Sequence, residues 1–311
     1  MTPKLSIVIV SYFVRQEVAD CLDELRKSEI PMEVFVVDNA STDGTYEMLL
    51  QRYADWPALN SIRSPVNLGL ARANNVPLDR LAGEYTLILN PDTIPTPELL
   101  RRLVAYLDAH PDVGVVGPLS LYADGTPHSS FHHRWTVLHI LLWSTVPRRW
   151  TSWWYDRPGR LLKEADVMFV SGACLLIRTS TFKQIGGYDD AYFLAVEDAA
   201  DLCRRAAATG KRVVYYPVAS IVHYGARSSS NAAVKPFSLL KGREGHLHYA
   251  RKWYGASGEA LVYTWLQTMS IVKIVALAIS APLGFARRMA SIRAHLFVLR
   301  RLRPGNGPMP V

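Results

Sequence analysis

The sequence predicts an α/β fold with a mostly parallel central sheet flanked by helices, followed by an apolar helical extension at the C-terminal end. Over the first 118 residues, short apolar runs alternate with segments of helical periodicity, as in strands joined by crossover helices. Residues 260–285 form a long apolar stretch, and the residues after it are basic. The 311 residues are enough for one large α/β domain or two modest ones.

Three apolar runs are typical of buried parallel strands. They cover residues 5–10, 34–37 and 85–89, and each is aliphatic or β-branched on both faces. The first run is too short for a signal peptide and has no cleavage site, so we expect a strand rather than a leader there. Further strands are predicted at residues 113–118, 167–178 and 213–222.

Helices are predicted between these strands. In residues 16–27, the apolar positions Val18, Cys21, Leu22 and Leu25 follow helical spacing. Residues 45–53 and 70–81 are predicted as a second and a third helix. Residues 97–110 begin with a proline, which is favoured in the first turn of a helix.

Residues 120–165 differ from the rest, because tryptophans and histidines gather there without a clear period. We expect loops and short helices over the active-site face in this stretch. The side chains concerned are Trp135, Trp143, Trp150, Trp153, Trp154, His128, His132 and His133.

The composition excludes several classes of protein. A chain with 49% hydrophobic and 20% charged residues is an ordered globular protein. The three cysteines are far apart and form no CxxC pair, which argues against a zinc knuckle or a disulfide framework and favours a reducing, intracellular compartment. The net charge is +8, the tail from Arg287 onward is basic, and no acid follows Glu259. This tail indicates an anionic membrane surface rather than nucleic acid, the alternative being a solvated tail.

The apolar stretch at residues 260–285 is long enough to cross a membrane, which needs about 20 apolar residues. Lys273 in its middle makes a simple span costly. The sequence leaves three alternatives open, namely a span, a helix or re-entrant pair at the membrane interface, and a helix buried against the rest of the chain.

Candidate ligand-binding residues follow the predicted strands, because ligands bind beyond the carboxyl ends of a parallel sheet. Ser11 and Tyr12 follow the first strand, and Asp38 follows the second. A carboxylate in the position of Asp38 can accept a hydrogen bond from a nucleobase or a ribose. For the nearby Ser41 and Asp43, capping of the next helix is the simpler interpretation.

Two further segments indicate an anion-binding site and a metal-binding site. In Asn67-Leu68-Gly69, the glycine permits a tight turn, the next helix could direct N–H groups at an anion, and Arg72 could add positive charge beside a diphosphate. Asn90-Pro91-Asp92 ends the strand at residues 85–89, where Asp92 could share a divalent cation with phosphates. Each segment could also be an ordinary turn.

The second half of the chain contributes a separate acidic cluster. Glu197, Asp198 and Asp201 are close in sequence, and a helix that begins at Asp198 places Asp201 one turn further on. Acids at the start of a helix can also be purely structural. His223 ends the last predicted strand and is a possible phosphate or metal ligand, although a lone histidine is more often structural.

Taken in order, these pieces resemble glycosyltransferase family 2, whose fold is called GT-A. The resemblance covers about residues 4–255 and is greatest to bacterial rhamnosyltransferases of cell-wall and O-antigen assembly. The matching stretches are Ser6-Ile7-Val8-Ile9-Val10-Ser11-Tyr12, Val37-Asp38-Asn39-Ala40-Ser41-Thr42-Asp43-Gly44-Thr45, Asn67-Leu68-Gly69, Leu89-Asn90-Pro91-Asp92, and Gly186-Gly187-Tyr188-Asp189 leading to Glu197-Asp198.

The resemblance implies a role for each candidate residue. It makes Asp198 the general base, Asp92 a metal ligand, and His223 a residue that approaches the metal or the diphosphate. Asn90 replaces the first acid of the family's Asp-x-Asp motif. Asp201 lies one residue later than the last acid of the family's Glu-Asp-x-Asp pattern. Glu197 and Asp201 are therefore expected to be supporting residues. The donor site is expected to comprise Ser11, Tyr12, Asp38, Asn67, Gly69, Arg72 and Asn90.

The implied reaction is a single displacement with inversion at the anomeric carbon and Mg²⁺ or Mn²⁺ as cofactor. The expected donor is a dTDP- or UDP-sugar, with rhamnose as the candidate sugar. The expected acceptor is a hydroxyl of a glycan or of a polyprenyl-diphosphate-linked glycolipid at the cytoplasmic face of the cell membrane. The expected domains are residues 1–255, with a nucleotide-binding half (1–118) and an acceptor-binding half (119–255), and a membrane-associated helical region at 256–311.

Two other functions compete with this one. A nucleotidyltransferase would use a similar sheet, but its Gly-rich basic loop after the first strand is absent from Ser11-Tyr12-Phe13-Val14-Arg15. A non-catalytic scaffold that binds sugar nucleotide or membrane would not need both Asp92 and Asp198.

Overall fold

The computed structural model describes residues 2–146, 150, 156–194, 196–225, 235–279 and 285–305. The strands are β1 (Leu5–Ser11), β2 (Met32–Asn39), β3 (Leu59–Ser64), β4 (Tyr85–Leu89), β5 (Thr93–Ile94), β6 (Val113–Leu121), β7 (Pro127–His128), β8 (Phe131–His132), β9 (Ala165–Asp166), β10 (Phe169–Val170), β11 (Cys174–Arg178) and β12 (Arg212–His223).

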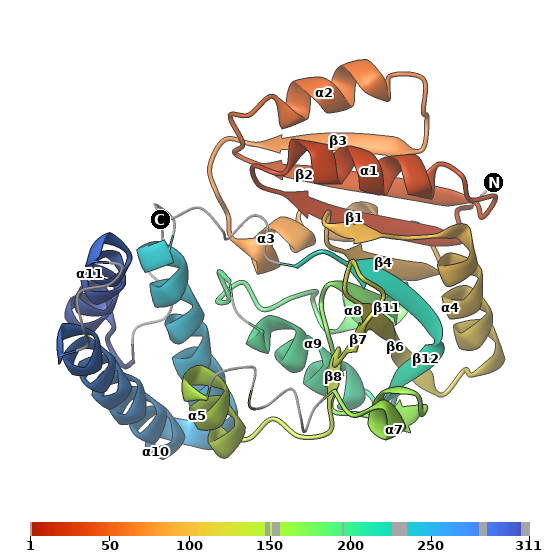
Figure 1. Cartoon of the computed structure of the whole chain (residues 1–311). Helices are drawn as coiled ribbons and strands as arrows, with labels where there is room; N and C mark the ends of the chain where they lie inside the picture. Colours follow the sequence, from red (N-terminus) through yellow and green to blue (C-terminus); the bar gives the residue numbers. More distant parts are fainter. Residues whose placement is uncertain are drawn as a thin grey trace.

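The helices are α1 (Arg15–Leu25), α2 (Thr45–Arg52), α3 (Leu70–Asn75), the 3₁₀ turn η1 (Leu78–Arg80), α4 (Pro97–Ala109), α5 (Val137–Thr145), α7 (Pro158–Leu161), α8 (Thr179–Gln184), α9 (Glu197–Ala207), α10 (Lys235–Ile279) and α11 (Phe285–Arg301). Figure 1 shows the sheet with helices packed on it, and α10 and α11 at one side of the molecule.

The central sheet of the described chain has ten strands, in the order β3-β2-β1-β4-β11-β6-β12-β5, with β7 and β9 pairing at its sides. The three predicted N-terminal strands are confirmed, and they run parallel, with Val8 opposite Phe35 on one side and Ile88 on the other. Every residue of β1 and β4 is buried, because both faces of the sheet are covered. The carboxyl ends of β1, β2 and β4 therefore meet at one edge.

The predicted fold class is confirmed, with two corrections to the sheet. The predicted single strand at residues 167–178 is wrong, because the chain turns at Ser171-Gly172-Ala173 and forms the separate strands β10 and β11. β11 lies antiparallel to both β4 and β6. β3 was not predicted, because it is an edge strand whose residues are mostly half-exposed and lack a continuous apolar run.

The predicted helix at residues 70–81 is also wrong in extent. α3 ends at Asn75, and the chain continues through the short 3₁₀ turn η1. Pro77 has no N–H to donate to the preceding turn, so the α-helix cannot continue through it.

The core lies on both faces of the sheet. On one face, Ile7 and Ile9 pack with Leu22 of α1 and Leu103 of α4. On the other, a larger cluster unites β-strand residues with α9, α5 and the first part of α10, and includes the fully buried Trp135. The expected short elements of residues 120–165 are β7, β8, α5 and α7, while Trp153 and Trp154 lie outside the described residues.

The C-terminal extension is helical, as predicted. α10 starts at Lys235, but its backbone leaves the helical conformation at Gly255 (φ 73°, ψ −171°). The part after this break returns along the first part, so that the Arg243 guanidinium donates to the Ser270 hydroxyl. By length and composition alone, residues 236–279 include a stretch that could cross a membrane, with a mean hydropathy of 1.5.

Candidate functional site

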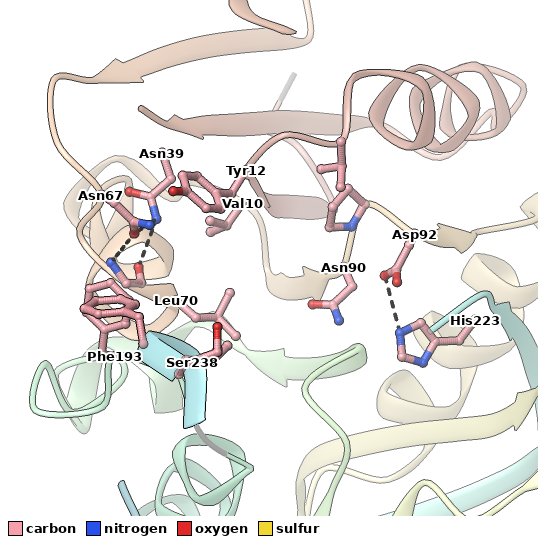
Figure 2. A pocket seen from close by; sticks show the side chains of 15 residues that line it. Val10, Tyr12, Asn39, Asn67, Leu70, Asn90, Asp92, Phe193, His223 and Ser238 are labelled. Atoms are coloured by element: carbon pink, nitrogen blue, oxygen red, sulfur yellow. Dashed lines mark hydrogen bonds and ion pairs between the residues drawn. The ribbon is translucent and has the colours of Figure 1, made fainter. Parts of the chain in front are cut away.

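A cleft of about 340 Å³ opens at the carboxyl edge of the sheet. Its walls come from the ends of β1, β2, β4 and β12, the turn before α3, the loop before α9 and the first turn of α10 (Figure 2). The lining residues are Val10, Tyr12, Val14, Asn39, Asn67, Gly69, Leu70, Asn90, Pro91, Asp92, Phe193, Leu194, His223, Phe237 and Ser238. A mostly apolar cleft with a few convergent polar groups is typical of a small-molecule site.

Four of the seven residues predicted for the donor site line this cleft, namely Tyr12, Asn67, Gly69 and Asn90. The two predicted metal ligands, Asp92 and His223, line it as well. Ser11 and Asp38 lie beneath its wall, both fully buried, with the Ser11 hydroxyl 3.3 Å from the Asp38 carboxylate. Burial raises the pKa of Asp38, and hydrogen bonds from Ser41 and Ser11 oppose that rise.

Arg72 does not line the cleft. Its side chain is 55% exposed and lies 3.7 Å from the carboxylate of Asp190. The predicted contact between Arg72 and a diphosphate would therefore require the side chain to leave Asp190.

A pair of asparagines shapes one end of the cleft. Asn39 donates to the Asn67 side chain at 2.9 Å and accepts the Leu68 N–H at 2.8 Å. The Gly69 N–H is donated to Asn67, and the Leu70 N–H to the Phe193 carbonyl. Asn39 was missed in the sequence, although its position directly after Asp38 at a strand end was a usable signal. These bonds hold the turn, and they occupy three N–H groups at the start of α3.

Gly69 is required by the close approach of the loop before α9. A Cβ atom on Gly69 would lie 2.7–2.8 Å from the ring, the Cα and the carbonyl oxygen of Phe193. The backbone at Gly69 has φ 79° and ψ 172°, a combination that is essentially confined to glycine.

We expect the Gly69→Ala variant to lose both stability and affinity for a ligand bound in this cleft. The strained backbone alone costs on the order of 1–3 kcal/mol, and the Phe193 backbone has to move as well. The melting temperature and the ligand dissociation constant measure the two effects. Gly125→Ala is the matched control, since Gly125 has φ 80° but open space around its Cβ position. If both variants show the same change in melting temperature and affinity, the close approach of Gly69 to Phe193 does not contribute to either.

Asp92 and His223 form the polar end of the cleft (Figure 2). The antiparallel pairing of β5 with β12 places His223 opposite Thr93, next to Asp92. The His223 Nε2 atom lies 3.3 Å from the Asp92 carboxylate, and both side chains are mostly buried. The Tyr224 N–H is donated to the Asp92 carbonyl, which fixes the two segments together.

This pair fits a divalent ion only in part. Within the described ranges, no three His, Cys, Asp or Glu side chains gather as a self-sufficient metal site. Asp92 supplies one carboxylate and His223 one imidazole, and both face an open cleft. Mg²⁺ and Mn²⁺ commonly take one or two carboxylates and complete their shell with phosphates and water. The pair therefore suits an ion that arrives with a phosphorylated ligand.

Asp198 lies at the start of α9, outside the lining of the cleft. It is only 5% exposed, and one of its carboxylate oxygens accepts the Ala199 N–H while the other has no hydrogen-bond partner. Burial raises its pKa to about 7, and the neighbouring Glu197 and Asp201 add to the rise. A buried carboxylate with a pKa close to neutrality is suited to general-base catalysis.

The two acids beside Asp198 are occupied by partners from distant segments. Glu197 is fully buried and accepts from the Trp135 indole at 3.2 Å and from His246 at 2.7 Å. Asp201 accepts from the Trp253 indole at 2.9 Å and pairs with Arg205. These bonds tie α9 to α10 and to the aromatic segment, and so fix the position of Asp198 between them.

The wall formed by Phe193, Leu194, Phe237 and Ser238 was not predicted. Phe193 and Leu194 precede the acidic cluster closely, so their position was a weak signal. Phe237 and Ser238 belong to the first turn of α10, far along the chain, and no local pattern connects them with the strand ends. The Lys241 ammonium lies 5.4 Å from the Phe193 ring and 5.5 Å from the Phe237 ring, and connects the two sides of this wall.

Comparison with known proteins identifies a family. The model of glycosyl transferase family 2 matches residues 6–186. An N-acetylglucosaminyl-diphospho-decaprenol L-rhamnosyltransferase of Mycobacterium tuberculosis (strain CDC 1551 / Oshkosh) is 33% identical over 247 residues, which are 74% of this chain and 78% of the relative. The O-antigen biosynthesis protein RfbC of Myxococcus xanthus is 28% identical over 83% of this chain, but the match covers only 20% of RfbC.

Among solved structures, the fold is similar to the mannosyltransferase PcManGT from Pyrobaculum calidifontis, determined in complex with GDP-Man and Mn²⁺. The TM-score is 0.57 at 18% sequence identity, and the match covers 96% of this chain and 86% of PcManGT. This likeness confirms the predicted fold.

Proposed function

Because this chain belongs to glycosyl transferase family 2, we propose that it is an inverting glycosyltransferase that elongates a polyprenyl-diphosphate-linked glycan. The proposed donor is a dTDP- or UDP-sugar, and L-rhamnose is the first candidate for the transferred sugar. The observation that supports this choice most is the 33% identity to a decaprenol-linked rhamnosyltransferase, which extends over most of both chains.

The donor is proposed to bind in the cleft at the carboxyl edge of the sheet. Tyr12 and Leu70 offer apolar surface to a base and ribose, and Asn39 and Asn67 keep the adjacent turn in place. Asp38, buried behind Ser11, is proposed as the acceptor of a hydrogen bond from the base.

Asp92 and His223 are proposed to hold Mg²⁺ or Mn²⁺ together with the donor diphosphate. Their carboxylate and imidazole groups lie side by side at the mouth of the cleft, 3.3 Å apart. The related fold of PcManGT was determined with Mn²⁺ and a nucleotide sugar. When bound, such an ion supplies positive charge that stabilises the departing diphosphate.

Asp198 is proposed to take the proton from the acceptor hydroxyl. With a pKa of about 7, a large share of the carboxylate is ionised at neutral pH and still basic enough to accept a proton. The hydroxyl then attacks the anomeric carbon from the face opposite the nucleotide, which inverts the configuration. Trp135, bound to Glu197 next to Asp198, comes from the aromatic segment that is proposed to shape the acceptor side.

A donor panel tests the proposed function. Purified chain is given dTDP-rhamnose, UDP-sugars and a GDP-sugar, each with a short-chain prenyl-diphosphate-linked GlcNAc and with Mg²⁺ or Mn²⁺. We expect dTDP-rhamnose to give the highest rate of product formation, and EDTA to abolish it. NMR of the linkage formed reports inversion.

Two results would contradict the proposal. Retention of configuration would exclude the single displacement, and full activity in EDTA would exclude the metal. Preference for another donor would support glycosyl transfer but replace rhamnose as the transferred sugar.

A further inference from the structure

The exposed apolar side chains of this chain are not spread evenly. Nine of the 19 large apolar side chains that are exposed in the described part of the chain belong to α5, α10 and α11, which pack together at one side (Figure 1). On α10 after the break at Gly255, they form a stripe along one side of the helix. We call this the apolar stripe; its members are Leu261, Ile271, Val272, Val275 and Ile279, each at least 50% exposed.

The opposite side of the same helix is attached to the catalytic domain. Val262, Leu266 and Ser270 follow one another at four-residue spacing and are fully buried. The Trp265 indole donates to the Leu141 carbonyl of α5 at 3.2 Å, and Ser270 bonds to Arg243 of the first part of α10. Residues 256–270 therefore lie alongside the catalytic domain.

This attachment leaves too little helix to cross a bilayer. In the described part of the chain, the portion of α10 after Ser270 is residues 271–279, and nine residues of α-helix are about 13 Å long. The hydrocarbon core of a bilayer is about 30 Å thick. On α11, His295 already lies 3.4 Å from Arg243 again, so the chain has returned to the catalytic domain.

Charge identifies the kind of surface that would cover the stripe. The outer side of α11 combines Leu296 and Phe297 with the exposed Arg293, Arg300 and Arg301. Apolar residues flanked by arginines are typical of helices that lie in the headgroup region of anionic membranes. Arg288 stands in the first turn of α11, which makes insertion of this end into the hydrocarbon core costly.

We infer that the hairpin of α10 and α11 lies flat in one leaflet of a membrane containing anionic lipid, with the apolar stripe at the acyl boundary, and that it does not span. The inference builds on the proposed function, because a lipid-linked acceptor has to be reached at a membrane surface. The first turn of α10 lines the donor cleft, so the same helix would connect the cleft with that surface.

Vesicle flotation tests the stripe. Full-length chain is mixed with phosphatidylcholine vesicles that contain or lack phosphatidylglycerol. The double variant Ile271→Glu, Val275→Glu is expected to bind the anionic vesicles about tenfold more weakly or worse than the wild type. Val66→Glu, Val218→Glu is the matched control, since these residues are 57% and 54% exposed on the catalytic domain. Equal binding by wild type and stripe variant would overturn the inference.

Cysteine labelling tests the orientation. The native Cys21, Cys174 and Cys203 are buried, so single cysteines at Ser257→Cys and Ala290→Cys would report selectively. In sealed inverted membrane vesicles, an impermeant maleimide should label both positions from the cytoplasmic side. If one of the two cysteines is labelled only from the non-cytoplasmic side, the helix spans the membrane and the inference is overturned.

Two further measurements separate the alternatives. The first is sedimentation of both proteins. A dimeric wild type that binds no vesicles, together with a monomeric stripe variant, would assign the stripe to contact with a second copy and overturn the inference. Transfer to a water-soluble, short-chain acceptor should be unchanged in the stripe variant. If the wild type transfers no sugar to this acceptor, the proposed function is contradicted. Flotation and labelling test the membrane inference alone.

Discussion

Replacing Asp198 with asparagine is expected to lower turnover by about 10²–10⁴-fold while donor binding survives. The side chain lies outside the cleft that is proposed to bind the donor, so its loss should leave nucleotide affinity intact. Asparagine keeps the shape and can still accept the Ala199 N–H, but it cannot take up the acceptor's proton. The measurement is kcat for transfer together with the Kd for the nucleoside diphosphate.

The pH dependence gives this prediction a second readout. A general base is active when deprotonated, so we expect wild-type kcat to rise with pH and to level off above the Asp198 pKa of about 7. The residual activity of Asp198→Asn should lack that rise. Asp55→Asn, on an exposed residue paired with Arg26, is the control and should retain wild-type behaviour. Turnover within a factor of two of the wild type in Asp198→Asn would exclude the assignment.

As the pH rises, the stability of the wild type should fall while its kcat rises. Because the folded-state pKa of Asp198 lies above the ordinary value, its contribution to stability is fully present in acid and is lost as pH rises through about 7. The melting temperature of Asp198→Asn relative to the wild type should therefore be higher at pH 8 than at pH 5. A difference that is constant with pH would mean that Asp198 is not destabilised by burial.

The parts of the fold that could be predicted are those that local pattern specifies. β1 and β4 are buried throughout and β2 is buried from Val34 onward, and each has a continuous apolar run that the sequence displays directly. The edge strand β3 lacks that signature, because water covers part of it. The antiparallel direction of β11 depends on where the chain returns after α7 and β10, and no residue in Cys174–Arg178 encodes it.

The site divides in the same way. Asp92 and His223 were each recognisable at the end of a strand, but only the pairing of β5 with β12 brings them within 3.3 Å. Arg72 was expected beside the ligand because of its place in sequence, and its side chain instead lies near Asp190. Phe237 and Ser238 reach the cleft through the packing of α10, which is a property of the whole fold.

The Asp92→Asn variant is expected to lose transfer by about 10²-fold or more, and to lose the effect of Mn²⁺ on nucleotide binding. Asparagine preserves the turn and the backbone bond from Tyr224, so the fold should remain. Calorimetry of nucleoside diphosphate binding, with and without Mn²⁺, separates metal loss from a damaged cleft: affinity without metal should equal that of the wild type.

The single-acid character of this site makes that result decisive. The Asp-x-Asp motif expected from the family resemblance would supply a second carboxylate, whereas Asn90 here leaves Asp92 with His223 as its neighbour. Glu17 and Asp20 of α1 line a small hollow on the other side of Asp92 and are the alternative acidic partners. If Asp20→Asn weakens the Mn²⁺ effect as strongly as Asp92→Asn, the ion sits on the α1 side. If only Asp92→Asn and His223→Ala weaken it, the ion lies in the cleft, where a bound diphosphate can complete its coordination.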